Sequence, residues 1–331
     1  MELANTEQTR ETKQKESKNT AMNAGIFFVL IILLEIPMSQ LIHYVQDLVS
    51  ADYSVLVSVL FTQGYLLLGA VVYILLTKTD VKKEFRVQRY RVSTFFLSLL
   101  LLITASPMAM WLNVVSQLWV KNQTSAAIFQ ITDHLPYGVG IAVVACLPGF
   151  IEETLYRGIM LSSFRKRSAL NGIVISALSF GLMHMNFNQM LYAVYLGIVF
   201  ALVVEATGSI VSTMILHMLF NAINTSYLYV LPKIYELAAQ NTGVSLEEAL
   251  NATPTKEQLI PMIVLLAPFA VGGLVLMVLL LIAIAKLNGR SLTWATITEK
   301  KDETAQSVNL PLLIGWVICL IFSVLNHISS I

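Results

Sequence analysis

The sequence predicts an all-α protein, a polytopic bundle of about eight or nine transmembrane helices. Of its 331 residues, 56% are hydrophobic and only 12% are charged, whereas a soluble domain has about 25% charged residues. A helix that spans a bilayer needs about 20 mostly apolar residues, and runs of this kind recur along almost the whole chain. The sequence lacks the alternating strands of about ten residues that a membrane β-barrel would require.

Nine apolar runs follow one another, and each predicts a membrane span. They comprise residues 22–43, 54–77, 92–120, 137–163, 170–187, 189–206, 209–229, 261–285 and 310–328. Short links such as Gly208-Ser209 divide the fifth to seventh runs, so the borders are least distinct there.

The chain begins with a hydrophilic segment. Residues 1–21 mix Glu with Lys, and the apolar run behind them is long and contains Glu35. A cleavable signal peptide has a short basic start and an apolar stretch of about 7–15 residues. We therefore expect residues 1–21 to form a disordered cytoplasmic tail that leads into an uncleaved first span.

Positive charges indicate the orientation. With the N-terminus inside, the inner segments (the tail, 78–91, 165–167 and 286–301) hold 17 Lys and Arg residues, and the outer loops hold three. Cytoplasmic loops of membrane proteins are enriched in Lys and Arg. We therefore expect a multi-pass protein of the cell membrane, with a cytoplasmic N-terminus and an external C-terminus.

Two longer outer connections, residues 121–136 and 230–260, complete the layout. In the second, Ser245 precedes Glu247 and Glu248, a pattern compatible with a short surface helix at residues 245–250. A solvated connector is the simpler interpretation.

The overall charge argues against a nucleic-acid partner, and the cysteines argue against a disulfide framework. The net charge is +1, so no basic field attracts nucleic acid, and we expect no nucleic-acid partner. Cys146 and Cys319 both lie in apolar runs and form no CxxC motif, so they predict no disulfide framework.

Ionisable residues inside the spans are the candidates for function, since a charge at the bilayer centre costs about 2.5–3.5 kcal/mol or more. Glu35, in the first span, could pair with Arg157 or face a polar cavity. Glu205 lies at the inner end of the sixth span, where it could reach interfacial water. Three histidines at span ends or in a loop need no functional explanation: His43, His134 and His327.

The fourth span contains two adjacent carboxylates and an arginine. Glu153 and Arg157 are four residues apart, so they share one helix face and can form a charge-assisted pair. Glu152 points about 100° away and has no local partner, which suits a general base. Pro148 removes a backbone hydrogen bond one turn earlier, and with Gly149 it could let water enter. A structural Glu–Arg lock would explain the pair equally well, but it leaves Glu152 unexplained.

Two later spans each add a histidine. Phe180 and His184 share a face of the fifth span, so the ring could orient the imidazole, although a lone histidine in an apolar helix is more often a packing residue. In the seventh span, His217, Asn221 and Asn224 form a polar stripe. Donors four residues apart can hydrogen-bond an oxygen that develops negative charge, but such a stripe also serves contacts between helices.

The three clusters lie at similar depths. At about 1.5 Å per residue, Glu152, His217 and His184 lie roughly 16, 12 and 21 Å from the inner ends of their spans. One buried cavity near mid-membrane could therefore hold all three.

Three ordered motifs on these spans resemble the intramembrane glutamic endopeptidases related to type II CAAX prenyl proteases, the CPBP or Abi family. The motifs are Glu152-Glu153-x-x-x-Arg157, Phe180-x-x-x-His184 and His217-x-x-x-Asn221. The resemblance covers about residues 137–229, which would form a catalytic helical core. Around this core we expect the tail (1–21), N-terminal transmembrane helices (22–136), and an external loop with C-terminal transmembrane helices (230–331). The family is often described with eight spans, one fewer than the nine runs.

The resemblance implies a mechanism. Glu152, aided by His184, would activate a water that attacks a peptide carbonyl, and His217 with Asn221 would hold the oxyanion. The supporting residues would be Glu153, Arg157 and Phe180. The resemblance implies no covalent acyl-enzyme, no metal and no other cofactor.

It also implies a class of partner. The substrate would be a peptide or protein associated with membrane lipid, which is prenylated in the eukaryotic branch of the family. Bacterial relatives resemble processing or immunity proteins for small peptides, and we expect a bacterial protein here.

Other functions stay open. A metalloprotease could use two glutamates and two histidines, but the chain has no HExxH motif. A serine or cysteine protease is disfavoured because no Ser or Cys lies in a GxSxG context. A transporter, a scaffold or an immunity protein could use the same polar residues as a proton relay or in helix contacts.

Overall fold

The computed structural model describes residues 2–89, 91–122, 124–242 and 254–329, and all regular secondary structure in these ranges is helical. The all-α prediction is confirmed. In chain order the elements are α1 (Glu2–Gln46), η1 (Ala51–Tyr53), α2 (Ser54–Thr77), α3 (Val81–Glu84), α4 (Val92–Ser116), α5 (Thr124–His134), α6 (Tyr137–Ile141), η2 (Ala142–Cys146), α7 (Leu147–Glu153), η3 (Thr154–Leu161), α8 (Ser162–Phe164), α9 (Ala169–Met183), α10 (Phe187–Thr207), α11 (Ile210–Thr242), α13 (Lys256–Leu287), α14 (Trp294–Thr298) and α15 (Leu310–Ser329).

Eight segments of the described residues are long and apolar enough to cross a membrane, and the chain is a multi-pass membrane protein. They are Lys18–Gln46, Ala51–Thr77, Val92–Ser116, Tyr137–Phe164, Phe187–Thr207, Ile210–Pro232, Lys256–Leu287 and Leu310–Ser329. The predicted fifth span is α9, which has only 15 residues and extends about 22 Å. Ten of these 15 residues are buried, so protein covers most of α9 and the helix does not need the full thickness of the hydrocarbon core.

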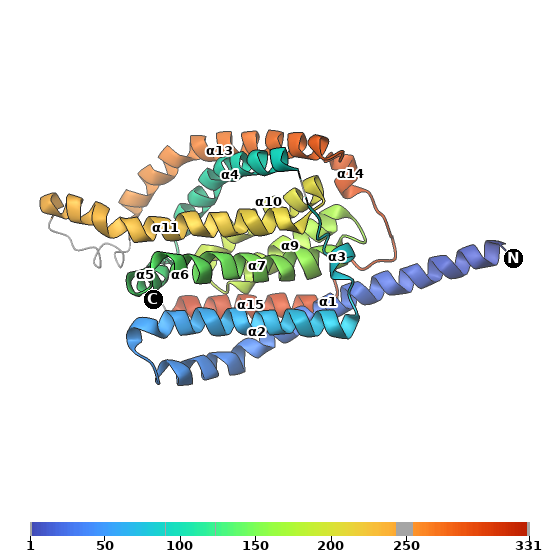
Figure 1. The fold of residues 1–331 in the computed structure, drawn as a ribbon, viewed down its shortest axis with the longest axis horizontal. Coiled ribbons are helices and arrows are strands. Elements are labelled where there is room, and N and C mark those ends of the chain that lie inside the picture. Colours follow the sequence, from blue (N-terminus) through green and yellow to red (C-terminus); the bar gives the residue numbers. More distant parts are fainter. Residues whose placement is uncertain (1, 90, 123, 243–253, 330–331) are drawn as a thin grey trace.

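Figure 1 shows the long helices packed side by side. The first helix starts at the end of the bundle where α3 and α14 lie, and α15 ends at the opposite end. The described chain thus starts and ends at opposite ends of a bundle that contains eight long apolar segments, one fewer than the nine predicted, and the shorter α9. Large apolar side chains of α13, such as Val264, Leu265 and Phe269, point outward and are exposed, as they would be toward lipid.

Two apolar clusters form the interior. The first joins α1, α2, η3, α9 and α15 and includes Tyr65, Tyr156 and Phe180. The second joins α4, α10, α11 and α13 and includes Phe200 and Leu216. The fourth span packs on α9 and on α11, so it lies where the two clusters meet.

The fourth span is not a regular α-helix. It consists of α6, the π-helix η2, α7, the π-helix η3 and α8. π-turns are rare and often occur at functional sites. Pro148 lies just after η2, where its missing N–H disturbs the hydrogen-bond ladder, as the sequence predicts. Each extra residue in a turn rotates the following side chains around the helix axis.

The start of the chain differs from the expected disordered tail. The first helix begins at Glu2, and Figure 1 shows it extending beyond the bundle. Glu, Lys, Gln and Ala in this segment are strong helix formers, and a helix that the first span has already nucleated extends at low cost.

The two outer connections are also more helical than expected. The first contains α5, and the second begins with a continuation of α11 to Thr242. The short surface helix considered at residues 245–250 lies outside the described residues.

Candidate active site

A buried ion pair anchors the site. The Arg157 Nη1 atom lies 2.7 Å from Glu153 Oε1, and both side chains are fully buried, so the pair predicted from their spacing is confirmed. Arg157 Nη2 also donates to the carbonyl oxygen of Gly197 on α10 at 3.1 Å. The Arg157 guanidinium stacks on the rings of Phe180 and Phe200, with its Cζ 4.8 and 5.3 Å from their centroids. These contacts compensate a charge that would be costly in hydrocarbon.

His217 of α11 lies between the two glutamates. Its Nδ1 atom is 3.0 Å from Glu153 Oε1, and its Nε2 atom is 3.8 Å from Glu152 Oε2. Because a carboxylate only accepts, Nδ1 donates to Glu153. The longer distance exceeds a hydrogen bond. The structure thus brings Glu152, Glu153, Arg157 and His217 together in one buried group.

A close approach of two helices makes this group possible. A Cβ atom at Gly149 of α7 would lie 2.9 Å from the backbone nitrogen and 3.1 Å from the Cα of Met218 on α11. Gly149 precedes Glu153 by about one turn, and Met218 follows His217 directly. The missing side chain at residue 149 therefore lets α7 and α11 come near enough for the glutamate–histidine contact.

Gln63 of α2 is a site residue that the sequence interpretation missed. Its Nε2 atom donates to Glu152 Oε1 at 3.2 Å, and the side chain is 7% exposed. Its Oε1 atom is buried and has no hydrogen-bond partner among the described residues. A mid-span amide in the second apolar run was the signal that could have found it.

His184 lies next to the group but does not join it. Its Nδ1 atom is 2.8 Å from the Phe180 carbonyl oxygen. The Phe180 ring packs edge-on against His184, with centroids 5.0 Å apart, which confirms the expected aromatic contact. The same ring lies 5.6 Å from His217. In the part of the chain that is described, His217 is therefore the imidazole next to Glu152, and His184 makes no hydrogen bond to that glutamate.

The amide stripe behind His217 is divided. Asn221 is half-buried one turn after His217, and no hydrogen bond joins it to the glutamates within the described residues. Asn224 is exposed and donates to the Phe220 carbonyl oxygen at 2.8 Å. Asn221 thus lies on the site's own helix with its amide available, and Asn224 points away.

Two further intramembrane glutamates have partners other than those expected. Glu35 accepts a hydrogen bond from Tyr65 and not from Arg157. The Arg157 guanidinium is instead paired with Glu153, which lies in the same span as Arg157. Glu205 forms ion pairs with Arg86 and Arg165 and is 9% exposed. It is therefore neutralised by arginines that flank the spans and does not extend into interfacial water.

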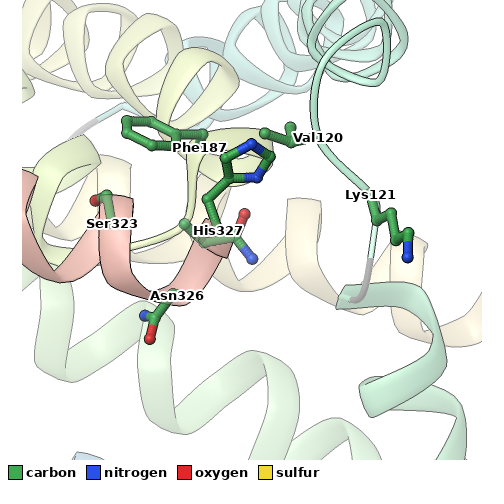
Figure 2. A pocket seen from close by; sticks show the side chains of 7 residues that line it. Val120, Lys121, Phe187, Ser323, Asn326 and His327 are labelled. Atoms are coloured by element: carbon green, nitrogen blue, oxygen red, sulfur yellow. The ribbon is translucent and has the colours of Figure 1, made fainter. Parts of the chain in front are cut away.

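A small pocket lies beside the turn that follows His184. Figure 2 shows its lining, which comes from three places: the end of α15, the turn before α10 and the segment after α4. The residues are Val120, Lys121, Asn186, Phe187, Ser323, Asn326 and His327. None of the predicted site residues lines it. Among the described residues, no group of three or more His, Cys, Asp and Glu side chains is arranged to hold a metal ion.

Comparison with known proteins adds a family to this geometry. Residues 135–223 match the family described as type II CAAX prenyl endopeptidase Rce1-like. The comparisons with curated proteins and with solved structures give no match. The matched segment contains all three motifs, from Glu152 to Asn221. The family consists of membrane endopeptidases, hydrolases that act on a peptide or protein substrate. Residues 135–223 of this chain are therefore similar to the Rce1-like family, and this match supports the CPBP or Abi group of CAAX-type intramembrane proteases that the motifs resemble.

Proposed function

We propose that this protein is a glutamic intramembrane peptidase, which hydrolyses a peptide bond of a membrane-associated or lipidated substrate. One observation carries the proposal. Among the described residues, no cation lies within hydrogen-bond distance of Glu152, yet its Oε2 atom lies 3.8 Å from His217 Nε2, beside the buried Glu153–Arg157 pair. A carboxylate placed in this way can take a proton from a water molecule.

Glu152 acts as the general base and then as the general acid. It removes a proton from water as the water oxygen attacks the carbonyl carbon of the substrate. The tetrahedral intermediate then breaks at the C–N bond, and Glu152 returns the proton to the leaving amine. The products are a carboxylate and an amine, and no covalent acyl-enzyme forms.

His217 and Asn221 stabilise the oxyanion. Glu153 accepts from His217 Nδ1, which directs the other ring nitrogen toward the reacting atoms near Glu152. His217 can donate to the oxyanion through Nε2 only when that nitrogen carries a proton, because Nδ1 already donates to Glu153. Donors aimed at a developing oxyanion contribute about 3–4 kcal/mol each in proteases. His184, which contacts the same Phe180 ring as His217, has only a supporting role in this mechanism, because among the described residues it makes no hydrogen bond to Glu152.

Gln63, Glu153 and Arg157 position these groups. Gln63 holds the Glu152 carboxylate through Oε1, so Oε2 is the oxygen that receives the proton. Glu153 is locked by Arg157 and in turn fixes the plane of the His217 ring. Phe180 packs against both imidazoles.

The fold suits this chemistry. We propose that residues 137–229 form the catalytic core and that the remaining spans, including α2 with Gln63, complete the site. We also propose a bacterial cell-membrane location with the N-terminus in the cytoplasm. A substrate would then reach the buried group from within the lipid.

The decisive experiment is Glu152→Gln in the purified, reconstituted full-length protein, assayed with a membrane-anchored fluorogenic peptide. We expect cleavage to fall by a factor of about 10²–10⁴, the contribution of a general base. Glu303→Gln, at a side chain that is 79% exposed, is the matched control and should cleave like wild type.

Undiminished cleavage by Glu152→Gln would refute the glutamate mechanism. No cleavage by the wild-type protein, with a cellular phenotype that persists in the variant, would favour a transporter, scaffold or immunity role. Loss of activity with chelators would favour a metalloprotease.

A further inference from the structure

Basic side chains from several connections converge on the C-terminal end of α10. Arg86, which follows α3, and Arg165, which follows α8, flank Glu205. The Arg86 Nη1 atom is 3.3 Å from Glu205 Oε1, and the Arg165 Nε atom is 2.8 Å from the same oxygen. Arg86 Nη1 also donates to the Val204 carbonyl oxygen at 3.4 Å. These two arginines have a structural explanation, since they neutralise a buried carboxylate and the negative end of the helix.

Two more cations lack that explanation. The Arg290 guanidinium lies so close to Gly208 that a Cβ atom there would be 2.6 Å from its Cζ. Lys301 interacts electrostatically with Arg165, Arg86 and Glu205. Within the described residues, neither Arg290 nor Lys301 forms an ion pair. We call Arg86, Arg165, Arg290 and Lys301 the α10-end cluster.

The α10-end cluster carries more positive than negative charge. Its four cations have two carboxylates near them, Glu205 and, beside Lys301, the exposed Glu299. Burial, and then the nearby Arg165 and Arg290, lower the pKa of Arg86 to about 10 against the opposing effect of Glu205. Partial burial of the otherwise exposed Lys301 and the nearby Arg165 likewise lower the pKa of Lys301. Both shifts have the direction that burial and neighbouring cations produce.

The position of the α10-end cluster indicates what could neutralise it. Arg165 directly follows the span that ends at Phe164, and Arg290 is three residues beyond the end of α13. Glu205 is two residues before the end of α10. These side chains therefore lie where spans leave the hydrocarbon, at the level of lipid headgroups. Figure 1 shows α3 and α14, which border the α10-end cluster in sequence, at this same end of the bundle.

We propose that the α10-end cluster binds the phosphate of an anionic phospholipid headgroup. A phosphate accepts charge-assisted hydrogen bonds from guanidinium and ammonium groups, and basic pockets between spans on the cytoplasmic side of a membrane suit such headgroups. Arg290 and Lys301 supply hydrogen-bond donors to the phosphate, and Arg86 and Arg165 add to the positive electrostatic potential around it. Glu205 is eight residues beyond Gly197, about 12 Å along α10, so this site is separate from the catalytic group and does not depend on the proposed peptidase activity.

The test measures lipid binding directly. The full-length protein, purified in a neutral detergent, is titrated with phosphatidylglycerol, with phosphatidylcholine of the same chain length, or with inorganic phosphate. Bound lipid is counted by native mass spectrometry, and the melting temperature is recorded. The variant Arg290→Gln/Lys301→Gln removes two charges from the α10-end cluster, and Lys82→Gln/Lys300→Gln removes two exposed charges outside it. Lys301→Gln alone, at an exposed position, is the second variant should the double variant not fold.

We expect phosphatidylglycerol to bind and to raise the melting temperature of the wild type and of the Lys82/Lys300 variant, but to bind at least tenfold more weakly to the Arg290/Lys301 variant. Equal binding of the two lipids by the wild type would overturn the proposal. An equal loss of phosphatidylglycerol binding in both double variants would also overturn the proposal, since it would indicate only a general attraction between basic side chains and anionic lipid. An equal thermal shift with inorganic phosphate would overturn the assignment to a lipid and leave a site for free phosphate.

Discussion

Glu152 and Glu153 are neighbours with different surroundings. Glu153 is fully buried and contacts both Arg157 and His217. Glu152 is partly accessible, accepts one hydrogen bond from Gln63 and faces His217 at a longer distance. In the proposed mechanism the fixed carboxylate orients its neighbours, and the less constrained one exchanges a proton. This division of roles follows from two adjacent positions on one helix, which point about 100° apart.

Gln63→Leu tests the positioning of Glu152. The substitution removes the only hydrogen bond to Glu152 within the described residues and keeps a buried side chain of similar size. Hydrogen bonds to charged groups are worth about 1.5–3 kcal/mol, so we expect kcat to fall by roughly 10- to 100-fold. KM should stay close to the wild-type value, and the pH–rate profile should move, because Glu152 is the base in the proposed mechanism. Steady-state kinetics over a range of pH values on the reconstituted protein measure both.

The control for this prediction is Gln46→Leu, which removes the amide at the end of α1 that donates to the Ser54 carbonyl and to Ser58, away from the site. It should leave kcat and the pH profile unchanged. If Gln63→Leu lowers only the folded yield, Gln63 is a packing residue.

Spacing along one helix was enough to predict part of the site. The Glu153–Arg157 pair and the Phe180–His184 contact each join positions four residues apart, and the helical period places them on one face. For His217 and the glutamates, the sequence predicted only that they lie at similar depths in the membrane, and not that they are in contact. Gln63 and Phe200 were missed because their contribution depends on how α2 and α10 are rotated toward α7. The few polar residues in these apolar runs do not reveal that rotation.

Gly149→Ala tests the helix contact that carries the glutamate–histidine pair. A Cβ at residue 149 would lie 2.9 Å from the Met218 backbone nitrogen, which cannot move aside as a flexible side chain would. Overpacking of this kind costs about 1–3 kcal/mol. We expect a lower melting temperature together with a lower kcat, since α7 and α11 must separate and the contact between Glu153 and His217 lengthens.

Gly272→Ala is the matched control on α13, because nothing lies within 4 Å of a Cβ there. It should leave both the melting temperature and kcat at wild-type values. A Gly149→Ala protein with unchanged activity would show that the close approach of α7 and α11 is not required for the site.

Local rules explain which elements were predicted well. Eight apolar runs became spans because their length and composition suffice. The π-helical turns of the fourth span were not predicted. Pro148 indicated that one backbone hydrogen bond is missing, but the sequence does not show how the remaining backbone groups pair around it. The helical start of α1 was missed because low hydrophobicity was taken as disorder, although the same residues favour helix.

The molecule as a whole has an asymmetric distribution of charge along its long axis. The α10-end cluster, the start of α1 and the basic loop at 78–91 share one end of the bundle. Ion pairs satisfy some of these charges, such as Lys166 with Glu84 at 3.6 Å, but the excess at that end is positive. The enrichment of Lys and Arg in cytoplasmic loops predicts that this end faces the cytoplasm.

Reporter fusions in a bacterial host test this orientation. Fusions after Lys83, in the 78–91 loop, and after Lys121, in the segment that follows α4, should give opposite signals because one span separates them. A fluorescent protein should be bright after Lys83, and alkaline phosphatase should be active after Lys121. If phosphatase is active after Lys83 and inactive after Lys121, the bundle is inverted. The charge distribution would then not have governed insertion, and the α10-end cluster would face the outer leaflet. The glutamate group, buried between the two ends, would keep its geometry in either orientation, so a peptidase assay and the fusion experiment can fail independently.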